Sequence, residues 1–278
     1  MHSFICAACG TQFAPSQNPP SQCPVCMDER QFVPRGGQRW ATMPDLQRHF
    51  ENELVRIDEG LFAVVTRPQF AIGQRAYLVQ TREGNVLWDC VSLVDPDTIS
   101  TIWAHGGVSA IAISHPHHYA SMVAWSHAFG GIPIYLHEQD RTWVQHSDAA
   151  VEFWSGESKS LPGGLTLVHC GGHFAGGTVL HWASGAGGRG ALLTGDVLQV
   201  CPDRKSFGFM YSYPNFIPLC ADAVRGIAAR VDGYEFAMAF GALGNVIEEG
   251  AKAAVARSAD RHARAIGPEG VFASGSWR

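Results

Sequence analysis

Three histidines follow a short apolar run in the middle of the chain, where Ile111-Ala112-Ile113-Ser114 leads into His115-Pro116-His117-His118-Tyr119. Side chains two residues apart on an extended segment point to the same side, so we expect His115 and His117 to converge and His118 to point elsewhere. Neutral imidazole is a common ligand of zinc, iron and copper. Catalytic zinc sites use three protein ligands and leave a position open for water, so the pair predicts part of a hydrolytic metal site.

Two later segments offer further ligands, each at the predicted end of a strand. They are the glycine-rich run Gly171-Gly172-His173-Phe174-Ala175-Gly176-Gly177-Thr178 and the segment Ala191-Leu192-Leu193-Thr194-Gly195-Asp196. In this order, a strand followed by HxH, then Gly-x-His-x-x-Gly, then a strand ending in Gly-Asp resembles the metallo-β-lactamase fold superfamily. The resemblance extends roughly from Trp40 to the C-terminus.

The resemblance implies a role for each matching residue. In that superfamily the HxH pair and the Gly-x-His histidine hold a first metal ion, which assigns His115, His117 and His173 to it. The Gly-Asp carboxylate, here Asp196, lies between the first and the second metal. Asp89, at the end of an early predicted strand, matches the first-motif aspartate of the family, which organises nearby loops without touching metal.

The second-metal ligands of the family are missing from this chain. The full family pattern is HxHxDH, which requires Asp and His where the chain has Tyr119 and Ala120. The late histidine of the family follows a strand, and Ala242 stands at the best-placed position. We therefore expect a mononuclear site.

The predicted chemistry is metal-assisted hydrolysis of a small molecule. A bound zinc ion lowers the pKa of its water to about 7, and Asp196 would orient that water or accept its proton. Tyr119 could donate a hydrogen bond to a developing oxyanion, and either Tyr119 or His118 could line the pocket as a proton relay. Relatives act on thioesters, lactones and other small esters. The aromatic segment 207–216 is either a wall of the pocket or a partly buried connection.

A second metal site is predicted at the N-terminus, where Cys6-Ala7-Ala8-Cys9 and Cys23-Pro24-Val25-Cys26 form two CxxC knuckles. Four thiolates at this spacing make a closed tetrahedral site, and metal binding supplies the folding free energy that so short a segment lacks. The segment resembles a zinc ribbon or a rubredoxin-like knuckle. We favour structural zinc, although iron accepts the same ligands. No signal peptide opens the chain, so we expect a reducing, cytoplasmic location with metal in place of disulfides.

Composition agrees with an enzyme-like chain. Its 278 residues are 46% hydrophobic and 16% charged, with a formal net charge of -5. This length accommodates a small domain and a large one, which we place at residues 1–36 and 40–278, on either side of a linker near Pro34. The weakly acidic balance argues against a nucleic-acid partner. No apolar run reaches the roughly 18 residues needed to span a membrane.

The residue pattern predicts many short strands joined by tight turns and interleaved with helices. Periodicity by itself indicates an α/β or α+β protein, and the family resemblance implies a four-layer αβ/βα sandwich. We expect Asp97 to cap a helix over 98–104. The remaining helices are expected at 121–129, 219–230 and 246–266, with Glu248 and Glu249 on the exposed face of the last one. The predicted strands are 62–66, 76–80, 86–88, 111–113, 132–136, 165–169, 178–182 and 191–194.

Two other functions stay open. The missing second-metal ligands favour a non-catalytic or sensor protein that keeps the fold and uses the cysteine-rich segment as an interaction module. The third hypothesis is a redox protein in which iron in the four-cysteine knuckle passes electrons to iron at the histidine site. That function expects a dinuclear, carboxylate-bearing site, and Tyr119 and Ala120 argue against it.

Overall fold

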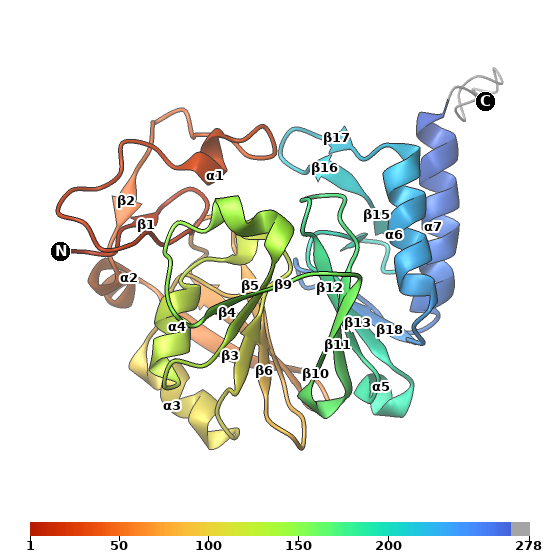
Figure 1. Cartoon of the computed structure of the whole chain (residues 1–278), viewed down its shortest axis with the longest axis horizontal. Coiled ribbons are helices and arrows are strands. Elements are labelled where there is room, and N and C mark those ends of the chain that lie inside the picture. Colours follow the sequence, from red (N-terminus) through yellow and green to blue (C-terminus); the bar gives the residue numbers. More distant parts are fainter. Residues whose placement is uncertain (268–278) are drawn as a thin grey trace.

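The computed structural model describes residues 1–267. Two β-sheets pack face to face, and helices cover both outer faces, which gives the four layers of the αβ/βα sandwich that the family resemblance implied (Figure 1). Aromatic and aliphatic side chains from both sheets fill the space between them, among them Trp88, Trp182 and Phe240. Each buried aromatic side chain removes about 150–250 Å² from water, so this layer contributes substantially to the stability of the fold.

The first sheet contains seven strands in the order of the sequence, antiparallel from β3 to β6 and parallel from β6 to β9. Because β6 and β7 are parallel neighbours, the residues that follow them meet at one edge. The strands are β3 (Glu51–Asp58), β4 (Leu61–Arg67), β5 (Arg75–Val79), β6 (Val86–Trp88), β7 (Ala110–Ala112), β8 (Ile134–His137) and β9 (Val151–Trp154).

The second sheet has six strands in the order β10-β11-β12-β13-β18-β19. Only its β13–β18 pair is parallel, so the segments that follow these two strands also meet at one edge. The strands are β10 (Ser158–Leu161), β11 (Leu165–His169), β12 (Thr178–Trp182), β13 (Ala191–Leu193), β18 (Met238–Phe240) and β19 (Val246–Ile247).

The outer layers are helical. Helices α3 (Pro96–Ala104) and α4 (Met122–Ala128) pack on the first sheet, and α6 (Ala221–Asp232) and α7 (Ala251–Ile266) pack on the second (Figure 1). The turn α5 (Gly185–Gly188) lies between β12 and β13. Two small hairpins cover one end of the second sheet, β14 (Gln199–Val200) with β15 (Phe207–Gly208) and β16 (Met210–Ser212) with β17 (Ile217–Pro218).

The N-terminal residues lie across the end of the sandwich where the strand-end motifs gather. Strand β1 (Ile5–Cys6) pairs with β2 (Trp40–Ala41), and the second cysteine knuckle forms the short helix α1 (Pro24–Met27), with Cys23 at its N-cap. Helix α2 (Met43–His49) then leads into β3. Figure 1 shows α1 beside the β16–β17 hairpin, and hydrogen bonds from that hairpin reach Glu29 and Arg30.

Three local expectations are corrected. Asp95, not Asp97, caps α3, because its side chain accepts a 2.8 Å hydrogen bond from the Thr98 backbone and Pro96 occupies the first turn. The last helix begins at Ala251 instead of 246, because Val246–Ile247 pairs with β18. Glu248 and Glu249 therefore precede the helix.

The prediction omitted strands β3, β9 and β10, and their sequences explain this. The polar strand β3 contacts only β4 within its sheet, and most of its residues are at least partly exposed. Strands β9 and β10 are four residues each and also partly exposed. Edge strands need little apolar surface, so their hydrophobic signal is weak. Within residues 1–267, no helix combines the length and the apolarity required to cross a membrane.

Candidate metal centre

Asp89 fixes the strand end that carries the first histidine. It follows β6, and its Oδ1 accepts hydrogen bonds from both the backbone N–H and the hydroxyl of Ser114, each at 2.8 Å. The Ser114 hydroxyl also lies 2.8 Å from Nδ1 of His115. This contact leaves Nε2 of His115 facing the interior of the site, where that buried atom has no hydrogen-bond partner.

The two histidines of the HxH pair do not share an extended segment. Residues Pro116–His118 form a 3₁₀ turn that begins directly after the extended His115. The turn brings His117 toward His173, whose Nδ1 lies 3.1 Å from the Met210 carbonyl oxygen and is held there as a donor. His115 and His117 converge as predicted, but the cause is the 3₁₀ turn and not the alternation of side chains along a strand.

The four predicted ligands lie together. His115, His117, His173 and Asp196 each contribute an atom to a group whose members all lie within 4.8 Å of one another. Nδ1 of His117 is 3.2 Å from Nε2 of His173, and Nε2 of His115 is 3.4 Å from Oδ2 of Asp196. Two ligand atoms bound tetrahedrally to one zinc ion at about 2.0–2.1 Å lie about 3.4 Å apart, so the donor set fits such an ion.

Gly195 lets Asp196 approach the histidines. Its φ is +51°, and a Cβ atom added to it would lie 2.5 Å from Cβ of Ser114. The ends of β13 and β7 therefore touch through a glycine, which places the next residue, Asp196, beside His115. The Tyr213 hydroxyl donates a 2.9 Å hydrogen bond to the Asp196 carbonyl oxygen and holds it from the other side.

Burial sets the protonation of the ligands. It lowers the pKa of His115 and His117, and burial together with the charge of His115 lowers the pKa of His173 to about 3. Burial alone would raise the pKa of Asp196, but the imidazoles around it, above all His115 with its Nε2 3.4 Å away, hold it well below its ordinary value. Three neutral imidazoles and one carboxylate are the forms that bind a metal ion.

His118 points into the site, so the expectation that it points elsewhere is wrong. Its Nε2 lies 3.9 Å from Oδ2 of Asp196, and its Nδ1 lies 3.1 Å from Oδ2 of Asp89. Burial alone would lower the pKa of His118, but the charge of Asp89 outweighs it and raises that pKa. The 3₁₀ turn is responsible, because it directs consecutive side chains toward one cavity.

Tyr119 lies outside the cavity, contrary to the proposed oxyanion contact. Its buried hydroxyl donates to the Asp140 carbonyl oxygen at 3.4 Å, and burial raises its pKa well above the ordinary value. The backbone explains this position, since Tyr119 follows the 3₁₀ turn with helical angles and its ring packs in the core beneath α4. Ala242, at the place of the late family histidine, does line the cavity.

A cavity of about 150 Å³ opens onto the histidines. Within residues 1–267, its wall contains no lysine or arginine and no carboxylate besides Asp196. Tyr213 and Pro214 belong to the aromatic segment that the sequence singled out, whereas nothing in the sequence pointed to Gln31 and Gln74. The lining residues are Gln31, Ile72, Gly73, Gln74, His117, His118, His173, Asp196, Tyr213, Pro214, Ala242 and Leu243.

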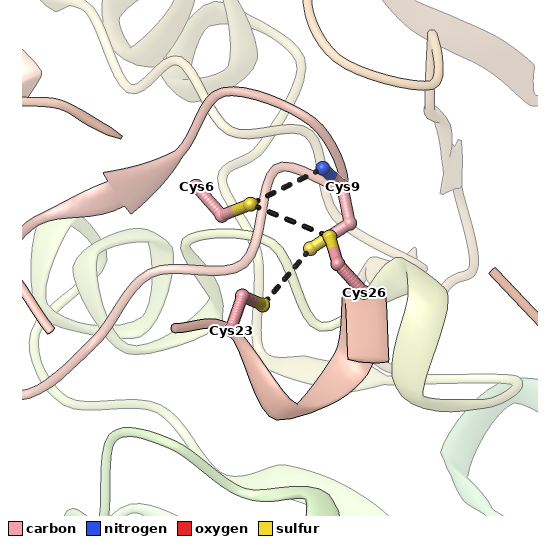
Figure 2. Close-up of side chains that lie close together, drawn as sticks. All are labelled: Cys6, Cys9, Cys23 and Cys26. Atoms are coloured by element: carbon pink, nitrogen blue, oxygen red, sulfur yellow. Dashed lines mark hydrogen bonds between the residues drawn. The ribbon is translucent and has the colours of Figure 1, made fainter. Parts of the chain in front are cut away.

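The four N-terminal cysteines form a second cluster (Figure 2). The sulfur atoms of Cys6 and Cys26 lie 3.6 Å apart, as do those of Cys9 and Cys23. Four sulfurs bound tetrahedrally to one ion at about 2.3 Å are about 3.8 Å apart, so this cluster also fits a metal. The Cys9 backbone N–H and the Gln38 side chain donate to the Cys6 sulfur, as expected for a thiolate.

Comparison with known proteins gives one relative in sequence and several in structure. No protein-family model matches the chain. Over 271 residues it is 45% identical to the uncharacterized protein YmaE of Bacillus subtilis (strain 168), a match that covers 97% of this chain and 98% of YmaE.

Among solved structures, the chain is similar to VMB-1 with a TM-score of 0.59 and 14% identity, covering 76% of this chain and 95% of that one. The metallo-β-lactamase from Pontibacter korlensis gives a TM-score of 0.55 and 15% identity, with 76% and 98% covered. SMB-1, a metallo-β-lactamase in complex with mercaptoacetic acid, gives 0.53 and 17%, with 76% and 94% covered. These likenesses establish the fold.

Proposed function

We propose that this chain, which belongs to the same protein family as YmaE and has the metallo-β-lactamase fold, is a metal-dependent hydrolase of a small ester, thioester or lactone. The observation that carries the proposal is the cluster of three neutral histidines and one carboxylate at the strand ends, open to a cavity. We assign zinc to both metal sites. A single ion at the histidine site is favoured because Ala242 offers no ligand there.

Each side chain of the histidine site has a proposed role. His115, His117, His173 and Asp196 would hold the metal, which when bound supplies Lewis acidity to water and to a carbonyl group. His118 would act as the proton carrier of the reaction. Its Nε2 faces the cavity and Asp196, and the carboxylate of Asp89 holds its Nδ1. This is the orientation of a general acid that donates a proton to a leaving group.

The wall of the cavity supports a small, uncharged substrate. Ile72, Pro214, Ala242 and Leu243 give it an apolar surface, and Gln31 supplies a neutral polar group. A site that binds a substrate carboxylate or phosphate usually presents an arginine or lysine. Within residues 1–267 none lines this cavity, so neutral esters, thioesters of small acids and lactones fit its chemistry better than anionic substrates do.

We also propose that the chain is divided into two parts. Residues 1–36 form a module closed by a structural metal at the four cysteines, and residues 40–278 form the metallo-β-lactamase-like domain. The absence of the second-metal ligands at Tyr119, Ala120 and Ala242 favours one competing function, a non-catalytic protein that keeps the fold and the metal. A hydrolase turns over substrate, whereas the non-catalytic protein does not.

Elemental analysis of the purified wild type and of two variants tests the assignment, together with turnover of a panel of esters, thioesters and lactones. We expect two zinc ions in the wild type, loss of one in His115→Ala, and loss of the other in Cys6→Ser. His49→Ala, an exposed histidine in α2, is the matched control and should keep both ions and full activity. A wild type that holds only one zinc ion, with that ion retained in His115→Ala, would contradict the proposal. Two ions without turnover of any substrate would favour the non-catalytic function.

A further inference from the structure

Gln74 connects the cysteine cluster to the histidine site through one amide group. It is buried directly before β5, and its Nε2 donates to the carbonyl oxygens of Cys9 and, at 3.0 Å, of His117. A side-chain amide has two N–H hydrogens, so both are used, one for each site. The backbone of a cysteine ligand and the backbone of a histidine ligand are therefore held by the same side chain.

Arg30 makes the corresponding connection on the other side of the cavity. It lies four residues after Cys26 in the chain, and its Nη1 donates a 3.3 Å hydrogen bond to the His173 carbonyl oxygen. Its guanidinium carbon lies 4.0 Å from the centre of the Phe174 ring, and Asp28 fixes the group through a 2.6 Å ion pair. The segment that carries His173 thus rests on a side chain of the cysteine module.

The loop after the first knuckle packs closely against the large domain. The Ser92 hydroxyl donates to the Gly10 carbonyl oxygen at 2.8 Å, and the Gln12 N–H donates to the Ala120 carbonyl oxygen at 2.9 Å. Gly10 has a φ of +85°, and a Cβ atom there would lie 2.5 Å from Ser92 Oγ and 2.8 Å from Gln74 Nε2. The loop therefore packs against Ser92 and Gln74, with no space for a side chain at position 10.

We propose that the four-cysteine module is a clamp on the histidine site, so that metal at the cysteines raises the metal affinity of the histidines. The first knuckle holds the His117 turn through Gln74, and the chain leaving the second knuckle holds the His173 segment through Arg30. A metal ion shared by both knuckles fixes these two supports relative to each other. Coupling of this kind is reciprocal, so metal at the histidines also strengthens binding at the cysteines.

Cobalt titration of the full chain, freed of metal, tests the clamp. Thiolate-bound cobalt gives a sulfur-to-metal charge-transfer band that histidine-bound cobalt lacks, so the two sites are followed separately. Gln74→Leu should leave the thiolate band unchanged and weaken cobalt binding at the histidines about 10- to 100-fold, the range usual for groups that orient ligands. Arg30→Met should act in the same direction. Gln22→Leu and Arg35→Met, exposed positions in the same module, are the matched controls.

The clamp rests on the proposed function only in assuming that the histidine cluster binds metal. Wild-type cobalt affinity at the histidines in both Gln74→Leu and Arg30→Met, with the thiolate band present, would overturn the clamp alone. Coupled binding without hydrolysis would overturn the proposed hydrolase and leave the clamp. A wild type that binds cobalt only through thiolates would overturn both. An unchanged thiolate band shows that the variant module is folded.

Discussion

Nδ1 of His118 lies 3.1 Å from Oδ2 of Asp89, and both side chains are almost completely buried. The same carboxylate binds the backbone and hydroxyl of Ser114 through its other oxygen. One aspartate therefore aligns the strand end that carries His115 and also charges the imidazole that faces the cavity. This arrangement places the ring beside the carboxylate as a buried ion pair, and the neighbouring negative charge raises the pKa of His118.

Replacing His118 should separate its role from that of the metal ligands. We expect His118→Gln to keep the zinc content of the wild type and to lower kcat about 10²- to 10⁴-fold, the usual contribution of a general acid. Elemental analysis and steady-state kinetics check this. Loss of zinc in His118→Gln would instead identify His118 as a ligand.

Asp89→Asn should move the pH profile. A general acid loses activity as pH rises through its pKa, and removing the negative charge lowers the pKa of His118. The basic limb of kcat should therefore shift to lower pH in Asp89→Asn. The asparagine oxygen still accepts from Ser114, so the strand end keeps its anchor. An unchanged basic limb would contradict the assignment of His118 as the acid.

Metal should stay at the histidine site in mild acid. Protons compete with metal for imidazole only near or below the pKa of each ring, and the pKa values of His115 and His117 are lowered while that of His173 is about 3. Equilibrium dialysis from pH 7 to pH 4 should therefore show zinc retained at pH 5, below the ordinary histidine pKa of about 6.5. Release between pH 7 and pH 6 would show that the rings are less buried than the structure places them.

Gly195→Ala should be more damaging than a comparable glycine substitution elsewhere. Gly195 and Gly187 both have positive φ, so alanine carries a similar backbone strain at each. A Cβ atom at Gly195 meets Ser114, whereas one at Gly187 has no neighbour within 4 Å. We expect Gly195→Ala to lose about 1–3 kcal/mol more in free energy of unfolding and to weaken zinc binding through Asp196. Equal losses in chemical denaturation would disprove the close contact.

Asp140→Asn should stabilise the protein at neutral pH. Burial raises the pKa of Asp140 from 3.8 to about 6, despite a hydrogen bond from the Gly176 N–H. A raised folded-state pKa means that the native state binds the proton more tightly, so stability present below pH 4 is lost as pH rises to 6. The variant avoids this loss, and its free energy of unfolding at pH 8 should exceed that of the wild type by up to about 3 kcal/mol. At pH 3.5 the two should be nearly equal.

Local patterns predicted the central elements of the fold well. The buried strands β4, β5, β6, β11, β12 and β13 have strong apolar signals. The errors occur where contacts with distant parts of the chain determine the secondary structure. Val246–Ile247 reads as the start of a helix and becomes a strand because β18 offers it an edge. Asp95 and Asp97 are both good capping residues by type, and the proline between them settles which one begins the helix.

The candidate site shows the same division. Ligand types and spacing indicated His115, His117, His173 and Asp196, since these lie in motifs. The direction of His118 depends on a 3₁₀ turn, and the position of Tyr119 depends on packing beneath α4, so neither follows from residue spacing. Gln74 and Arg30 belong to no motif. Gln74 contacts His117, which is 43 residues away in sequence, and Arg30 contacts His173, which is 143 residues away. Such contacts become visible only in three dimensions.

The position of the cysteine module has a consequence for biosynthesis. The Ser212 hydroxyl donates a hydrogen bond to the carbonyl oxygen of Arg30, and Ser212 is 182 residues further along the chain. Ribosomes add about 5–20 residues per second, so roughly 10 to 40 seconds pass between the synthesis of these two residues. Throughout that interval the four cysteines are already made, while the hairpin that contacts Arg30 in the native protein is not. The order of synthesis therefore favours filling of the cysteine site before the histidine site exists.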